Sequence, residues 1–223
     1  MPESKASPVA RDLIRIHSII TRGLNVTIEN SQSLVRRGYP DTSTRDGFVS
    51  YVRTLASVLD AHHLLEDELA FPYLRDKLPD VPYDLLMAQH REIVVILNEI
   101  KATVEAMEAS AQPVESLNKL NHGLRAIGDI WHPHIRVEED HFTAERINAL
   151  INMEEQERMS RKFSEHSQQH ARPDYLVVPF LLYNLLPEER AAFAQALPPI
   201  VTQQLVPFVW KEKWTPMTPF LLA

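Results

Sequence analysis

The sequence predicts an all-α protein whose main part is an antiparallel up-down-up-down four-helix bundle. Apolar residues recur every three or four positions through four long segments, and short turns rich in Gly, Pro and Ser separate these segments. Each of the four segments also places a histidine on its apolar stripe. We expect the bundle to span residues 8–150. Residues 151–223 are expected to form a proline-rich helical extension that packs on the bundle, either as a lid or as a subunit contact.

Composition limits the classes of function. The chain has 223 residues, of which 44% are hydrophobic, which is enough for a substantial core. Its net charge of -7 argues against binding to nucleic acid or to an anionic membrane surface. Because there is no cysteine, any metal must be held by His, Asp or Glu. No apolar run is long enough to cross a bilayer and no signal peptide is evident, so we expect a cytoplasmic protein.

The first helix is predicted from about Pro8 to Arg36, with Ser7 as its cap. His17 occupies a position of its apolar stripe. A turn at residues 38–41 ends it, and Ser43 with Asp46 resembles a capping box that opens the second helix.

The second helix is predicted to run to about residue 78, with a bend near Pro72. His62 and Glu66 are four residues apart, so both project from one face, and this face is the apolar stripe. An unpaired carboxylate at a core position costs several kcal/mol. Glu66 must therefore be protonated, paired with a cationic side chain or bound to a metal cation.

The third helix begins at Pro82 and carries His90 on its stripe, and the fourth follows a turn at residues 110–113. The fourth helix carries His134 and Glu138, which repeat the spacing of His62 and Glu66. The histidines come early in the first and third helices and late in the second and fourth. Because successive helices run in opposite directions, all of these side chains are expected to meet at one end of the core.

This set of side chains predicts a dinuclear metal site with the ligands His17, His62, Glu66, His90, His134 and Glu138. Two carboxylates can bridge two cations while the imidazoles complete the coordination, and a nitrogen and oxygen donor set suits iron or manganese, with zinc as a further option. A ferritin-like di-iron bundle is the alternative, since Glu138 and His141 form a Glu-x-x-His pair. It fits less well, because the second helix offers only residues 60–63 as the companion pair.

Residues 8–147 resemble the hemerythrin-like, or HHE cation-binding, domains. The resemblance rests on the segments 62–72 and 134–139 and on the isolated His17 and His90. It implies two non-haem irons with the four stripe histidines as terminal ligands and the two glutamates as bridges. Val94 stands where oxygen carriers have a second histidine in the third helix, and Glu138 stands where they have an aspartate one residue later. These departures indicate a six-ligand member with more open coordination positions.

Three functions follow from this reading. The first is a di-iron oxidoreductase that reacts with O2, peroxide or NO, with or without a small organic substrate. The alternatives are an O2 or NO carrier and an iron or redox sensor without turnover. The chemistry is assigned to the metal pair, so no separate catalytic side chain is predicted. His63 faces about 100° away from His62 and, like His141 one turn beyond Glu138, is a candidate to contact the ligands.

Overall fold

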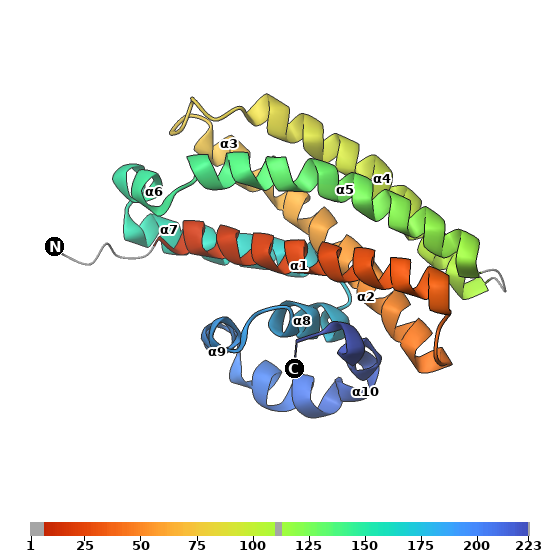
Figure 1. Ribbon diagram of the computed structural model, residues 1–223. Coiled ribbons are helices and arrows are strands. Elements are labelled where there is room, and N and C mark those ends of the chain that lie inside the picture. The colour runs from red at the N-terminus through yellow and green to blue at the C-terminus, as the bar shows by residue number, and fades with distance from the viewer. Residues whose placement is uncertain (1–6, 110–112, 223) are drawn as a thin grey trace.

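The computed structural model describes residues 7–109 and 113–222, and every regular element in this part of the chain is helical (Figure 1). The elements in chain order are α1 (Pro8–Arg37), α2 (Thr42–Leu65), the π-helical turn η1 (Glu66–Ala70), α3 (Phe71–Leu74), α4 (Tyr83–Ala109), α5 (Pro113–His141), α6 (Ala144–Leu150), α7 (Met153–His170), α8 (Asp174–Tyr183), α9 (Pro187–Ala196), the π-helix η2 (Val201–Val209), α10 (Lys211–Trp214) and the 3-10 helix η3 (Thr215–Phe220). The predicted all-α class is confirmed.

Four long helices form the bundle. Helix α1 packs against α2 and α5, and α4 packs against the same two helices. Figure 1 shows that the α1–α2 turn, the last turn of α4 and the first turn of α5 lie at the same end, whereas α3 and the loop to α4 lie at the opposite end. The order is therefore up, down, up and down, as predicted from the four amphipathic segments.

Side-chain and glycine caps set the ends of α1. The Ser7 hydroxyl accepts a hydrogen bond from the backbone N–H of Ala10, and Pro8 occupies the first turn, where its missing N–H is not needed. The helix ends at Gly38, whose φ of 71° lies in the left-handed region that favours glycine. For α2 the expected capping box is wrong: Asp41 is the cap and accepts from the N–H of Thr44 at 2.7 Å.

The second predicted helix does not continue unchanged to residue 78. It widens into η1 and then into the short α3, where Pro72 lacks the N–H that an α-helical ladder would need. In the π-helical turn the N–H of Phe71 bonds to the carbonyl of Glu66, five residues back. A bend near Pro72 was expected, but the π-helical turn was not. It includes three consecutive acidic residues, the first of which is Glu66.

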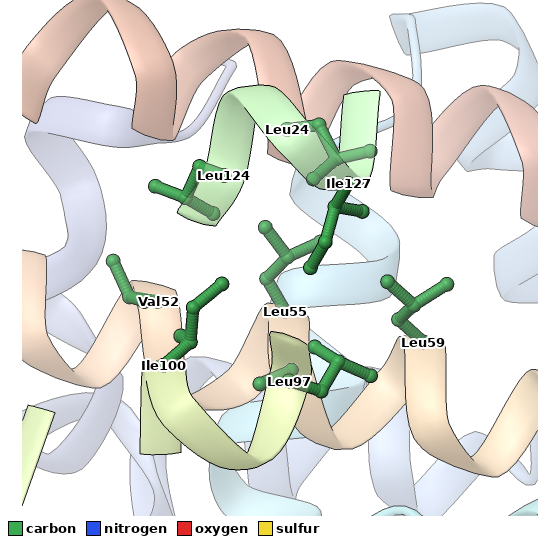
Figure 2. A pocket seen from close by; sticks show the side chains of 9 residues that line it. Leu24, Val52, Leu55, Leu59, Leu97, Ile100, Leu124 and Ile127 are labelled. Carbon is green, nitrogen blue, oxygen red and sulfur yellow. The ribbon is translucent and has the colours of Figure 1, made fainter. Parts of the chain in front are cut away.

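Two apolar clusters lie on either side of the buried histidines along the bundle. One fills the space between the four long helices and includes Leu24, Leu55 and Leu97. It contains a small cavity of about 10 Å³ that only apolar side chains line (Figure 2). The second cluster closes the other end of the bundle and includes Phe71 and Phe142. The histidines and glutamates on the apolar stripes of the helices therefore lie in an apolar interior.

The chain after residue 143 lies against the bundle in two places. Ile147 and Ile151 of the α6 region and Met159 of α7 join the second apolar cluster, and α7 continues along α1 and α2. By contrast, α8 and η3 pack on α2, where the contacts involve its first half: Tyr51 donates a hydrogen bond to Asn184 Oδ1 at 2.6 Å. The elements that reach the histidine end are therefore α6 and α7. In the part of the chain that the structure describes, no helix has the length and apolarity needed to span a membrane.

Candidate metal centre

The structure brings the six predicted side chains together in the bundle core. All six are buried, with exposed fractions of 6% or less. They form two overlapping groups of four residues. Within each group, one nitrogen or oxygen atom of every residue lies within 4.8 Å of the corresponding atoms of the other three residues. The first donor group is His17, His62, Glu66 and Glu138, and the second donor group is Glu66, His90, His134 and Glu138. The two groups share both carboxylates, which is the arrangement that two bridged cations require.

Each carboxylate lies between one histidine of each donor group. Glu138 Oε2 is 3.1 Å from His17 Nε2, and its Oε1 is 3.4 Å from His134 Nε2. Glu66 Oε1 is 3.5 Å from His62 Nε2, and its Oε2 is 3.4 Å from His90 Nε2. The two oxygens of each glutamate thus point to different groups. This is the geometry expected of a bridging carboxylate.

The donor atoms converge without satisfying one another. Both oxygens of Glu66 and of Glu138, and Nε2 of His17 and His62, are buried without a hydrogen bond of acceptable geometry. The Nε2 atoms of His90 and His134 are only 3.1 Å apart. Converging lone pairs in a dry interior are costly unless a cation lies among them. The residues present therefore fit a pair of metal ions.

A second set of hydrogen bonds orients the imidazoles. Nδ1 of His17 lies 2.9 Å from Glu139 Oε1, and Nδ1 of His90 lies 2.8 Å from Asp67 Oδ1. Because a carboxylate accepts, Nδ1 carries the proton and Nε2 keeps its lone pair for a metal. Nδ1 of His134 similarly lies 3.0 Å from the side-chain carbonyl of Gln89.

None of these three partners was predicted from the sequence. Asp67 and Glu139 could have been found in the sequence, because each directly follows one of the two central glutamates. The repeated motif is therefore His-x-x-x-Glu followed by a second acidic residue. Gln89 had no such signal. Its role depends on α4 lying beside α5, which only the fold reveals.

Burial sets the protonation states of the metal-free site. Burial, together with the charges of Glu138 and Asp67, raises the pKa of Glu66 well above its usual value. Burial and the neighbouring imidazoles lower the pKa of His62 well below its usual value, and burial lowers the pKa of His134 to about 4. These imidazoles are therefore neutral at pH 7, as metal ligands must be.

His17 titrates in the opposite direction. Burial lowers its pKa, but the neighbouring carboxylates of Glu138 and Glu139 outweigh burial, so the net change is upward. A cation that binds here therefore competes with protons for His17 and Glu66, whose pKa values are both raised.

Aromatic rings line the site. The Trp131 ring lies 5.5 Å from that of His17 and 5.8 Å from that of His62, measured between centroids. Its Nε1 donates to Thr21 Oγ1 at 2.9 Å, which fixes the indole. On another side, Phe71 stacks on His90 with centroids 5.5 Å apart. These rings limit the access of water to the donor atoms.

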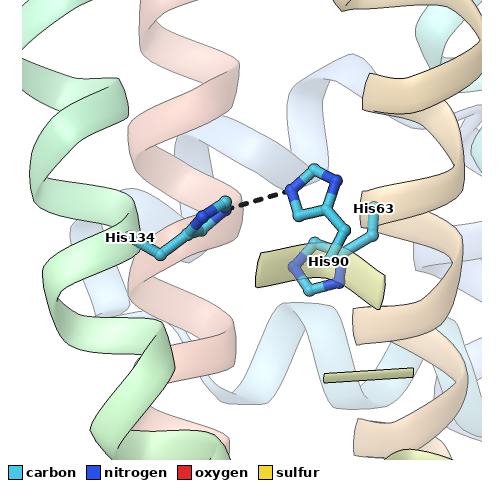
Figure 3. A group of neighbouring side chains, drawn as sticks. All are labelled: His63, His90 and His134. Atoms are coloured by element: carbon cyan, nitrogen blue, oxygen red, sulfur yellow. Dashed lines mark hydrogen bonds between the residues drawn. The ribbon is translucent and has the colours of Figure 1, made fainter. Parts of the chain in front are cut away.

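His63 lies beside the second donor group (Figure 3). Its side chain is 2% exposed, and neither ring nitrogen has a hydrogen-bond partner among the described residues. The ring stacks on His90 with centroids 4.1 Å apart and planes inclined by 15°. One of its nitrogens lies within 4.8 Å of donor nitrogens of both His90 and His134. By contrast, Nδ1 of His141 donates to the carbonyl of Val137 in its own helix, at 2.7 Å.

The comparison with family models matches residues 9–145 to the hemerythrin HHE cation-binding domain. The chain belongs to this family. The resemblance read from the motifs is thereby confirmed, and the HHE domain is a cation-binding one whose candidate ligands are the His and Glu groups described above. The matched region ends within α6, so α7 and all later elements lie outside it. Searches of curated proteins and of solved structures found no match.

Proposed function

We propose that this HHE domain is a non-haem di-iron protein that reacts with O2, peroxide or NO as an oxidoreductase. The observation that supports the proposal is the overlap of the two donor groups at both Glu66 and Glu138. His17 and His62 would complete the ligands of the first ion, and His90 and His134 those of the second. The two glutamates would bridge the ions.

Iron is the proposed metal because of the donor set. Four imidazoles and two carboxylates without a thiolate suit iron or manganese, and suit zinc less specifically. Two histidines and two bridging oxygens give each ion four protein donors, fewer than the six positions that iron commonly fills. When bound, the iron pair would supply electrons and open coordination positions for a small molecule.

The surrounding residues would hold the donors and keep water away. Asp67, Gln89 and Glu139 fix the tautomers of three imidazoles, and Trp131 and Phe71 supply apolar walls. The small cavity of Figure 2 lies about one helical turn from His63 and Trp131. Two of its lining residues, Leu59 and Ile127, precede these two residues by four positions in their helices. Its wholly apolar lining offers no hydrogen bond to a water molecule.

We further propose that His63 contacts a small molecule bound at the second ion. Burial and the neighbouring imidazoles lower the pKa of His63 well below its usual value, so it is a neutral donor and acceptor. A buried imidazole with both nitrogens unpartnered costs free energy unless a bound molecule forms a hydrogen bond with it. Figure 3 shows His63 and His90 each with a ring nitrogen turned toward the side on which His134 lies.

The apolar walls also support a second candidate function, reversible O2 or NO binding without turnover. Apolar surroundings that exclude water restrain proton transfer and side reactions after binding. One experiment tests both candidates. The metal-free protein is loaded with Fe(II) in the absence of oxygen, the iron is counted, and the optical spectrum is followed after mixing with O2.

The proposed oxidoreductase predicts two tightly bound irons and a transient absorption band that decays to a stable diferric spectrum. A band that persists and disappears on degassing would support the carrier instead. Failure to retain two irons would contradict the dinuclear site itself.

A further inference from the structure

A second group of candidate metal ligands lies outside the bundle core. It consists of Glu68 in η1 and of His166 and His170 in α7, and one donor atom of each lies within 4.8 Å of the others. His166 Nε2 is 2.9 Å from Glu68 Oε2, and the rings of the two histidines have centroids 4.4 Å apart. None of these residues belongs to the two donor groups of the bundle core. Neither histidine was assigned a role from the sequence.

The local structure explains why the three side chains meet. His166 and His170 are four residues apart in α7, so both project from one face of the helix. A histidine pair at this spacing on one helix face is a known way to bind a transition-metal cation. Glu68 faces them because η1 directs Glu66 into the core and Asp67 to His90, while Glu68 stays half exposed beside α7.

His166 is built into the surface and does not extend freely into solvent. Its side chain is 10% exposed, and its Nδ1 is buried without a hydrogen-bond partner among the described residues. Glu68 is 54% exposed, which leaves the group open to a cation from solution. Two imidazoles and one carboxylate form a donor set typical of zinc sites with an open position.

The position of the group in α7 suggests what a cation would do there. The first half of α7 is held by buried side chains, among them Gln156, which accepts a hydrogen bond from Ser7 at 2.6 Å, and Met159. No residue in the described segment 164–170 is buried. Beyond the helix, the N–H of Arg172 donates to Ser57 Oγ at 3.1 Å. The end of α7 therefore lies between two attachments to the bundle, the buried first half of α7 and the hydrogen bond of Arg172. The contact of His166 with Glu68 lies between these two attachments.

We propose that Glu68, His166 and His170 bind a divalent cation, specifically Zn(II), that fastens the end of α7 to η1. The cation would link a helix outside the matched HHE region to the turn that carries Glu66. This proposal does not depend on the identity of the metal in the bundle core. It predicts that Zn(II) orders residues 164–170.

The test is a Zn(II) titration of the full-length, untagged, metal-free protein and of its His170→Gln variant. His170 is exposed, so the variant is expected to fold. The wild type should bind one equivalent of Zn(II) more than the variant at micromolar free metal. Glu68→Gln, on the opposite side of the contact, should lose the same equivalent. His132→Gln is the matched control, because it removes an exposed histidine of α5.

Amide hydrogen exchange supplies the second measurement. Zn(II) should slow exchange in residues 164–170 of the wild type and of His132→Gln, but not of His170→Gln. Equal stoichiometry in the wild type and both cluster variants would overturn the site. Loss of the equivalent without any Zn(II)-dependent protection in the wild type would overturn the fastening role. The test compares the Zn(II) equivalents bound by the wild type and by each variant, so it does not depend on how many ions the bundle core binds. Failure of the dinuclear core site would lower the number of bound equivalents in the wild type and in all variants equally.

Discussion

Glu138 Oε2 of α5 lies 3.1 Å from Nε2 of His17 in α1, yet the two atoms do not form a well-aligned hydrogen bond. The same relationship holds between Glu66 Oε1 and His62 Nε2, which are 3.5 Å apart. Donors that are close but misaligned with one another point to a common ligand. In the proposed centre this ligand is a metal ion.

Replacement of Glu66 by alanine should abolish binding of the second metal ion. Glu66 contributes to both donor groups, so its loss leaves each ion with one bridging group fewer. The measurement is the number of irons retained after anaerobic loading and desalting. Glu92→Gln, an exposed residue of α4, is the control and should retain two. Two tightly held irons in Glu66→Ala would show that Glu66 is not a bridge.

Asp67→Asn should weaken metal binding without removing a ligand. Asp67 accepts from Nδ1 of His90, and loss of such a partner typically costs about 10- to 100-fold in metal affinity. Competition with a chelator of known affinity measures the change. Asp84→Asn provides the comparison, since the Asp84 side chain is 92% exposed. Equal affinities in the two variants would argue against the orienting role of Asp67.

The stability of the metal-free protein should depend on Glu66 in a defined direction. Its folded-state pKa is raised by burial and by nearby carboxylates, so the folded state holds a proton that the unfolded state releases near pH 4.5. The contribution of Glu66 to stability is therefore lost as pH rises from 4.5 toward the folded-state pKa. Glu66→Gln should remove this loss and make the metal-free protein more stable than the wild type at pH 7.

Urea unfolding with a chelator present, from pH 4.5 to pH 8, measures the effect. The difference in unfolding free energy between Glu66→Gln and the wild type isolates Glu66 from the histidines, because the histidines are common to both proteins. The two proteins should converge toward pH 4.5 and diverge above it. A difference independent of pH would contradict the raised pKa.

The histidine positions could be predicted from the sequence because they depend on local periodicity. A histidine on a four-three apolar stripe must point inward whatever the neighbouring helices are. By contrast, Gln89 reaches His134 only because α4 and α5 are neighbours, and His166 reaches Glu68 across nearly a hundred residues of sequence. The start of α2 was misplaced because Asp41 and Ser43 are both good caps, and the local pattern does not choose between them.

Docking of η3 on α2 should depend on Gly47. A Cβ built at this residue would lie 1.8 Å from the carbonyl oxygen of Pro216, a backbone atom that cannot move alone. Gly47→Ala should therefore displace η3 and lower the unfolding free energy by about 1–3 kcal/mol. In α5, the nearest atom to a Cβ at Gly128 would be 3.8 Å away, so Gly128→Ala should instead stabilise the protein by up to about 1 kcal/mol. Thermal unfolding of both variants measures these opposite shifts, and a stable Gly47→Ala protein would contradict the close approach.

The role proposed for His63 predicts a change in small-molecule binding with little change in iron content. His63→Gln keeps a polar side chain of similar length but loses the ring that stacks on His90. The diferrous variant should bind two irons but release NO faster than the wild type, because its contact with the bound molecule is lost. Stopped-flow measurement of NO release, with iron content measured on the same samples, separates the two effects. His132→Gln should match the wild type in both. Loss of one iron in His63→Gln would instead identify His63 as a ligand of the second ion, and unchanged NO kinetics with two irons would assign it to packing alone.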